Sequence, residues 1–376
     1  MERQKTKWIR LNWRVLTVLA LAILVALTSL LIFNRDRLSM DSINRAIHYR
    51  RLGTAAQTDQ FQFLNSATNT FVTLGEGLAV ASASGLSVYD RTGNVQYSAI
   101  FSMQRPVIRE RGGFVLAYDM GGRAIQLGSS REALWRLDWE DPLIAVSVNE
   151  NGWLAVACEQ NGPRGAVTVV NAQGTPVWRW GSDRYVLGAV LASDNRTLAI
   201  STLTETGGEI LWYSVTAVAE DEPQAVFSYR GEVFFDLWFS NRRNLAVLSA
   251  NLFLYLSDSG EVLGEYHFFD RYLRAYDPGG DSVALYLSPH ETGIGGNFVL
   301  VSNIGADREI EILGTPLDIS LSGRYLAALF IDKLLLFRNG ALYAEFQETE
   351  GMTRVLARED GSVFRLSASR ARLLIP

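Results

Sequence analysis

A short apolar motif recurs eight times along the chain, and this repeat limits the possible folds more than any other feature. It reads LAVAS from Leu78, FVLAY from Phe114, WLAVA from Trp153, TLAIS from Thr197, NLAVL from Asn244, SVALY from Ser282, YLAAL from Tyr325 and SVFRL from Ser362. Successive motifs begin 36 to 47 residues apart. A period of about 40 residues with several short strands per unit is typical of β-propeller blades. The repeat predicts an all-β fold, an eight-bladed propeller, with seven blades as the alternative if the first or last unit is irregular.

Most repeats carry four strand patterns, which we label A to D from the centre of the ring outward. In the third repeat they are expected at Leu143–Val148, Trp153–Cys158, Ala166–Val170 and Thr175–Trp180. Asn- and Gly-rich turns separate A from B and C from D, as tight antiparallel hairpins require. The last repeat offers only three strands before the chain ends, at Thr353–Arg358, Ser362–Ser367 and Arg372–Ile375. We therefore expect Phe61–Leu64 to pair beside the final strand and close the ring, which removes an open sheet edge.

The N-terminal segment predicts a membrane anchor. Residues 1–14 carry five basic residues and one acidic residue, and the uncharged stretch Val15–Phe33 follows. A helix of this length crosses about 30 Å of hydrocarbon. A cleaved signal peptide is the alternative, but no small-residue cleavage pattern ends the stretch. We expect a bacterial cytoplasmic-membrane protein that crosses the bilayer once, with residues 1–14 inside and the propeller outside; five arginines beyond the span equal the basic residues of the tail, so charge bias alone does not decide the orientation.

Residues 34–56 are expected to connect the membrane to the ring, and the propeller is expected over residues 57–376. Ser39–Gly53 has the apolar spacing of a short helix, with Ser39 as its N-cap and Gly53 at its end. Its basic residues favour contact with anionic head groups. The alternative is a stalk helix that packs under the propeller.

Charge and cysteine content exclude several classes of function. Without the tail's five basic and one acidic residues, the totals of 35 basic and 40 acidic residues become 30 and 39, a formal charge of −9. A domain this acidic is unsuited to neutralising phosphates, so no nucleic-acid partner is expected. Cys158 is the only cysteine, which rules out an intramolecular disulfide and a thiolate metal cluster.

The sequence holds no recognisable catalytic motif. It lacks HExxH, GxSxG, a P-loop and paired CxxC. Its three histidines are His48, His267 and His290. We therefore expect no catalytic residues, no metal site and no cofactor, and a protein that is not an enzyme.

Long polar loops favour binding at one end of the ring. The B–C connections are long at Glu159–Gly165, Thr202–Gly208 and Leu287–Gly296, and in a propeller they share a face with the D–A connections. Loops on a rigid scaffold commonly carry binding residues. The candidate binding residues on this face are Asp119, Asp141, Gln160, Arg164, Arg184, Thr204, Glu205, Arg271, His290 and Glu291.

Two levels of resemblance support this interpretation. SDNRTLAIS (Ser193–Ser201) and SLSGRYLAAL (Ser320–Leu329) resemble the A–B hairpins of WD-repeat and quinoprotein-like propellers, although the WD-repeat Gly-His and Trp-Asp pairs are absent and no quinone ligand set accompanies the second likeness. The basic tail, the span, SMDSINRAIHYRRLG, GLAVASASGLSVYDRTGNV, AYDMGG, SVNENGWLAVACE and STLTETG together resemble an uncharacterised bacterial family, a domain of unknown function. That resemblance implies a single-span, outward-facing propeller and draws attention to Tyr118, Asp119, Asn149, Asn151, Thr202 and Glu205.

The sequence thus favours a non-catalytic binding or scaffolding module, anchored in the lipid bilayer outside the cytoplasm. Its expected partner is an envelope protein, a peptide or a cell-wall glycan. The alternative is an extracytoplasmic propeller enzyme that acts on glycans or peptides, for which His290, Glu291 and Glu205 are the first residues to consider.

Overall fold

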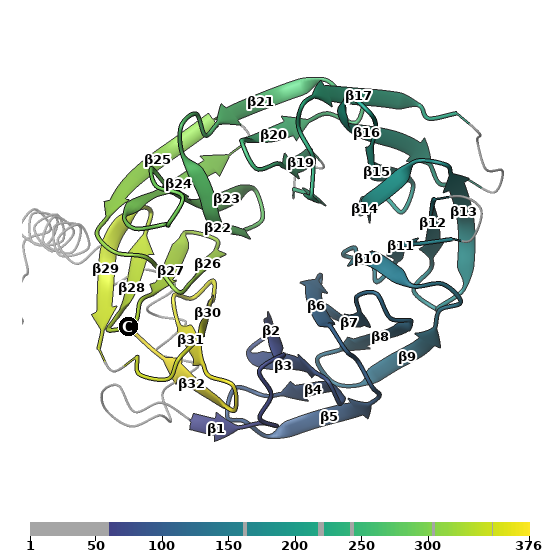
Figure 1. Cartoon of the computed structure of the whole chain (residues 1–376). Coiled ribbons are helices and arrows are strands. Elements are labelled where there is room, and N and C mark those ends of the chain that lie inside the picture. Colours follow the sequence, from purple (N-terminus) through teal and green to yellow (C-terminus); the bar gives the residue numbers. More distant parts are fainter. Residues whose placement is uncertain (1–59, 161–163, 217–221, 241–243, 303–304, 348) are drawn as a thin grey trace, which may run out of the picture. The chain divides into compact units, whose positions relative to one another are not determined.

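The computed structural model describes residues 60–160, 164–216, 222–240, 244–302, 305–347 and 349–376. Within these residues, 32 strands form eight antiparallel sheets of four strands each. The sheets are arranged radially as the blades of one ring (Figure 1), so the eight-bladed prediction is confirmed. The predicted span Val15–Phe33 and the predicted helix Ser39–Gly53 lie outside the described residues. Among the residues that are described, no helix is long and apolar enough to cross a membrane.

The strands follow the order A to D in every blade, with β1 supplying the D strand of the last one. The A strands are β2 (Thr70–Leu74), β6 (Pro106–Arg111), β10 (Leu143–Val148), β14 (Tyr185–Leu191), β18 (Asp236–Phe239), β22 (Tyr272–Pro278), β26 (Asp318–Ser322) and β30 (Arg354–Ala357). The B strands are β3 (Gly77–Ser82), β7 (Phe114–Asp119), β11 (Leu154–Cys158), β15 (Thr197–Leu203), β19 (Leu245–Leu248), β23 (Ser282–Ser288), β27 (Tyr325–Leu329) and β31 (Val363–Leu366). The C strands are β4 (Gly85–Tyr89), β8 (Ala124–Ser129), β12 (Gly165–Val170), β16 (Gly207–Ser214), β20 (Leu252–Leu256), β24 (Gly296–Ser302), β28 (Leu334–Arg338) and β32 (Arg370–Leu374). The D strands are β5 (Val95–Ile100), β9 (Ala133–Asp138), β13 (Pro176–Ser182), β17 (Ala225–Arg230), β21 (Val262–His267), β25 (Gly305–Ile312), β29 (Ala341–Phe346) and β1 (Gln60–Gln62).

The repeated apolar motif forms the B strands. Every residue of β3 and of β11 is buried, because each face of the strand packs against a neighbouring blade. The D strands instead alternate between exposed and partly buried residues, as in β5 and β9, because they lie at the outer edge of the ring. Continuous apolar runs are typical of strands that are buried on both faces, and alternation is typical of strands with one solvated face. The motif therefore marks the middle of each blade.

Polar side chains join neighbouring blades at several points. The Asn149 Nδ2 atom donates hydrogen bonds to Ala192 O at 2.9 Å and to Asn195 Oδ1 at 2.7 Å, from the third blade to the fourth. Asn151 Nδ2 donates to Ser193 O at 2.6 Å. The two asparagines that the family resemblance singled out therefore fasten one A–B turn to the next.

The chain ends close the ring, as the sequence predicts. Strand β1 pairs with β32 through Phe61 opposite Ala371. The paired strand is Gln60–Gln62 and not Phe61–Leu64, although Phe63 N still donates a hydrogen bond to Ser369 O at 3.0 Å. The Phe61 ring packs on Tyr89 of the first blade, with 5.3 Å between ring centroids.

Alternate connections of an antiparallel blade emerge at opposite ends of the ring, which defines two faces. We call the end formed by the B–C and D–A connections the loop face, and the end formed by the A–B and C–D turns the hairpin face. Strand β1 runs toward the loop face, because Gln62 pairs with Arg370 at the start of β32.

Candidate functional site

All ten candidate binding residues lie on the loop face. Each one belongs to a B–C or D–A connection, or ends a B strand as Asp119 does. Glu205, His290 and Glu291 are exposed there, on the fourth and sixth blades. The structure thus places these residues at one end of the ring, with the fifth blade between Glu205 and His290.

Several of the ten residues hold the ring together. The buried Asp119 accepts hydrogen bonds at Oδ1 from the backbone N–H groups of Gln104 and Arg105, at 2.8 and 2.7 Å. This carboxylate therefore fixes the D–A connection between the first two blades. A buried acceptor with two short backbone donors has a structural role that its side-chain type alone does not reveal.

Three arginines on the same face also interact with neighbouring protein side chains. Arg271 Nη1 lies 2.8 Å from Glu309 Oε1, and its Nη2 donates to the Tyr266 hydroxyl at 2.6 Å. Arg184 pairs with Glu209. Arg164 lies over the Tyr185 ring, with 4.9 Å from its Cζ to the ring centroid. Thr204 Oγ1 donates to Gly207 O at 2.8 Å within its turn.

Large exposed apolar side chains lie in the connections of the loop face but not in the described turns of the hairpin face, and this is a feature that the sequence analysis missed. The described residues include 19 such side chains. Twelve belong to loop-face connections or to strand ends beside them: Leu64, Ile100, Met120, Tyr185, Val233, Phe235, Phe269, Tyr272, Ile294, Leu313, Leu317 and Ile331. The other seven are each the first or second residue of a D strand, at the end of that strand nearer the hairpin face, and none lies in a hairpin-face turn of the described chain.

Three of the four side chains that are at least 80% exposed belong to the fifth to seventh blades; the fourth is Ile100, 85% exposed, at the end of β5 in the first blade. Phe269 is 80% exposed, Ile331 80% and Leu313 90%. Isolated exposed apolar residues are normal, but a concentration on one face marks an interaction surface. The available signal in the sequence was an apolar residue inside otherwise polar loops, such as Phe269 before Asp270.

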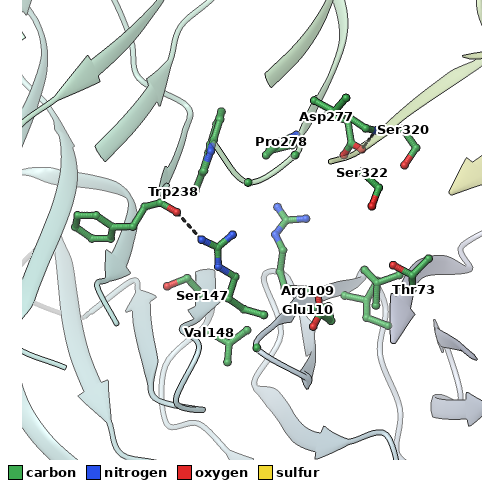
Figure 2. A pocket seen from close by; sticks show the side chains of 18 of the residues that line it. Thr73, Arg109, Glu110, Ser147, Val148, Trp238, Asp277, Pro278, Ser320 and Ser322 are labelled. Atoms are coloured by element: carbon green, nitrogen blue, oxygen red, sulfur yellow. Dashed lines mark hydrogen bonds between the residues drawn. The ribbon is translucent and has the colours of Figure 1, made fainter. Parts of the chain in front are cut away.

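A separate polar cavity occupies the centre of the ring toward the hairpin face. Its volume is about 780 Å³, and the A strands of all eight blades line it together with several A–B turns. None of the ten candidate binding residues lines it. Figure 2 shows part of its wall, with Arg109, Glu110, Asp277, Ser320 and Ser322 among the labelled side chains.

Two of the charged side chains in the wall are already paired. Arg111 Nε lies 2.8 Å from Glu150 Oε1, and its Nη2 donates to Phe239 O at 2.6 Å. This arginine therefore connects the second blade to the third and the fifth across the cavity. Its guanidinium thus contacts protein groups through both Nε and Nη2.

The carboxyl groups of the fifth and sixth blades are held in place by hydrogen bonds. Asp236 Oδ2 accepts from the Tyr276 hydroxyl at 2.8 Å, and its Oδ1 accepts from its neighbour Leu237 N at 3.0 Å. Asp277 Oδ2 accepts from Leu321 N at 2.7 Å.

Burial changes the acidity of this wall. Burial of the Asp277 carboxyl group raises its pKa to about 7, against the lowering effects of the Leu321 and Ser320 hydrogen bonds. Burial also raises the pKa of Glu110, and the nearby Glu150 and Glu359 carboxylates add to that rise. With a pKa of about 7, the Asp277 carboxyl group can both donate and accept hydrogen bonds near neutral pH.

The described part of the chain contains no cluster of side chains suited to binding a metal ion. No group of three or more His, Cys, Asp or Glu side chains is placed there to hold an ion. His267 instead lies 2.7 Å from Glu265 through Nε2, on the outer strand β21. Cys158 is buried, and burial raises the pKa of its thiol.

These features define a closed, eight-bladed propeller with exposed apolar and charged side chains on its loop face and a polar central cavity. Among solved structures it is similar to Sqt1 of Saccharomyces cerevisiae, with a TM-score of 0.60, 9% identity, and 85% of this chain and 99% of that chain covered. It is also similar to apo AztD of Citrobacter koseri, with a TM-score of 0.54, 12% identity, and 77% and 88% covered. A streptogramin B lyase structure gives a TM-score of 0.50 at 13% identity, with 85% and 98% covered. Likeness at such low identity shows the WD40-type propeller fold alone.

The sequence itself places the chain in a family. Residues 48–272 match the model of a family of unknown function, DUF5711, and because the match spans more than half of the chain, the protein belongs to that family. No curated protein sequence matches it. The resemblance to a domain-of-unknown-function family is confirmed.

Proposed function

We propose that the protein is a non-catalytic binding module, anchored in the cytoplasmic membrane with its propeller outside the cell, and that the loop face binds another envelope protein. One observation carries the proposal. Nine of the 19 large exposed apolar side chains lie in loop-face connections, while the described turns of the hairpin face have none of them.

The chemistry of the loop face fits a protein partner. Apolar anchors such as Phe269, Leu313 and Ile331 stand beside charged and polar residues, among them Arg271 and His290. Protein interfaces commonly combine apolar anchors with a polar rim. A glycan offers hydroxyl groups and little apolar surface. The formal charge of −9 outside the tail also opposes adsorption of this face onto anionic lipid.

The N-terminal segment supports the proposed location. Its basic residues and the uncharged stretch Val15–Phe33 have the composition of an uncleaved anchor.

Site-specific photocrosslinking in living cells tests the binding proposal. A photoreactive amino acid at Phe269, Leu313 or Ile331 should capture one and the same protein. The matched control is Leu263, an exposed apolar residue on the outer strand β21. Capture of no protein from the three loop-face positions, or of the same protein equally from Leu263, would contradict the proposal.

Reporter fusions test the location separately. A reporter that is active only outside the cytoplasm should function at the C-terminus, and a cytoplasmic reporter should function at the N-terminus. The opposite result would refute the proposed orientation but leave the binding face as a separate question for crosslinking.

A further inference from the structure

One cationic side chain in the central cavity makes no hydrogen bond or ion pair with the described residues, although its charge acts on the nearby Asp277 carboxyl group. Arg109 lies on β6 and is exposed to the cavity. Figure 2 shows it extending into the middle of the space, away from the wall. No hydrogen bond or ion pair joins it to any residue that the structure describes. Its neighbour two residues along the strand, Arg111, is by contrast bound to Glu150 and to Phe239 O.

We propose that Arg109 binds the carboxylate group of a small polar molecule that enters the central cavity. A guanidinium presents parallel N–H donors that match the two oxygens of a carboxylate. The cavity volume of about 780 Å³ lies within the usual range of small-molecule sites, about 300–1,000 Å³. The wall around the arginine is polar, which fits a ligand that carries further polar groups.

The acidic residues of the wall favour a singly charged anion over a doubly charged one. Glu110, Asp236, Asp277 and Glu359 all line the cavity. Of the two arginines that line it in the described part of the chain, Arg111 forms an ion pair with Glu150 and Arg109 forms none. A doubly charged phosphate would be repelled by these acids more strongly than a carboxylate would be, because like charges in a partly desolvated space oppose each other. One carboxylate with accompanying neutral or cationic donors is therefore the better match.

Oxygen atoms on the sixth and seventh blades are placed to accept hydrogen bonds from such donor groups of the ligand. Asp277, Ser320 and Ser322 gather on one side of Arg109 (Figure 2). Their oxygens accept hydrogen bonds from hydroxyl or ammonium groups. The ligand class is therefore a monocarboxylate with hydroxyl or ammonium groups, as in a sugar acid or in an amino acid or short peptide.

This site is independent of the proposed function. The cavity is lined by A strands and turns of the hairpin face, whereas the proposed protein partner binds the loop face at the other end. Loss of one activity therefore leaves the other measurable.

Calorimetric titration of the full-length protein in detergent tests the inference. The probes are sodium D-glucuronate, which carries hydroxyl groups, L-alanyl-L-alanine, which carries an ammonium group, and inorganic phosphate. At least one of the two carboxylates should bind with a Kd below about 10 mM and more tightly than phosphate. Binding of glucuronate alone identifies hydroxyl groups as the second feature of the ligand, and binding of the dipeptide alone identifies the ammonium group.

Two variants of Arg109 and one control make the test specific. Arg109→Ala should weaken binding at least about tenfold, because a hydrogen-bonded ion pair is lost. Arg109→Lys keeps the charge but not the planar donor pair, and should weaken binding less. Arg131→Ala changes an exposed arginine in the C–D turn between β8 and β9 and should leave binding unchanged.

Three results would overturn the inference. The first is that neither carboxylate gives a heat of binding. The second is that phosphate binds at least as tightly as the carboxylates. The third is that Arg109→Ala and Arg109→Lys both bind the carboxylates as tightly as the wild-type protein does. Far-ultraviolet circular dichroism and the thermal midpoint verify that each variant is folded. If Arg109→Ala does not fold, Arg109→Lys alone decides.

Discussion

The Tyr276 hydroxyl donates a 2.8 Å hydrogen bond to Asp236 Oδ2 and so connects the sixth blade to the fifth inside the cavity. Both residues lie on A strands, β22 and β18, at the centre of the ring. Burial and the Asp236 carboxylate both raise the pKa of Tyr276, so the phenol stays protonated and remains the donor.

We expect Tyr276→Phe to lower the free energy of unfolding by about 1–3 kcal/mol, because a hydrogen bond to a charged acceptor is lost while the ring is kept. Urea denaturation measures this change. Tyr272→Phe is the matched control, since Tyr272 lies on the same strand but is 46% exposed. Equal effects of the two substitutions would show that the Asp236 contact contributes nothing to stability.

Asp277 is expected to make stability depend on pH. Its pKa is about 7 in the folded protein and ordinarily 3.8, so the folded state holds the proton more tightly. The free energy of unfolding from this group is therefore highest below about pH 4 and falls as the pH rises through 7. The change amounts to at most about 4 kcal/mol, at 1.36 kcal/mol per pKa unit.

Asp277→Asn should remove this dependence. The variant should be more stable than the wild-type protein at pH 8 and differ little from it at pH 4. Denaturant titrations at a series of pH values measure the difference, with Asp258→Asn in an exposed turn as the control. A stability difference between Asp277→Asn and the wild-type protein that is constant with pH would show that Asp277 titrates normally.

Ring closure should depend on the Phe61 ring. Phe61 is 8% exposed and packs on Tyr89. Gly93 approaches it so closely that an added Cβ would lie 2.2 Å from the Phe61 Cβ atom. We expect Phe61→Ala to lower the free energy of unfolding by about 3–5 kcal/mol through lost burial and a remaining void.

Leu64→Ala is the control for that substitution, because Leu64 is 61% exposed and should change stability by no more than about 0.5 kcal/mol. Thermal or urea unfolding compares the two variants. Similar stabilities for both would mean that the β1–β32 closure does not hold the ring.

Asp119 should behave as a structural residue. Asp119→Ala removes the acceptor of two backbone N–H groups and should lower the free energy of unfolding by about 2–4 kcal/mol. Glu205→Ala, at an exposed position on the same face, should change it by no more than about 0.5 kcal/mol. If Asp119→Ala were as stable as the wild-type protein, Asp119 would have no structural role and would again be a candidate for binding a partner.

Much of the fold follows from local sequence pattern. The predicted A strand Leu143–Val148 has the observed bounds of β10, and the predicted B strand Trp153–Cys158 differs from β11 by one residue. These strands are recognisable because burial on both faces requires apolar residues at nearly every position. Closure by the N-terminal strand was also predictable, since the last repeat lacks a fourth strand.

The central cavity was not predictable in the same way. Arg109, Asp236 and Asp277 each look like single polar residues in a short strand, and 127 residues separate Arg109 from Asp236. Only the ring brings their strands to the same space. Asp119 is the opposite case. From the sequence it was a candidate binding residue, but in the structure it is buried and accepts hydrogen bonds from backbone N–H groups.

The amino-acid sequence alone determined the repeated blade, the order of the strands and the way in which the ends meet, because the pattern of burial along each strand appears in neighbouring residues. The tertiary structure decided between eight blades and seven, which polar groups share the central cavity, and which connections expose apolar residues. Those relationships depend on distances between residues in different blades, and such distances are set by the closure of the ring and not by any local pattern.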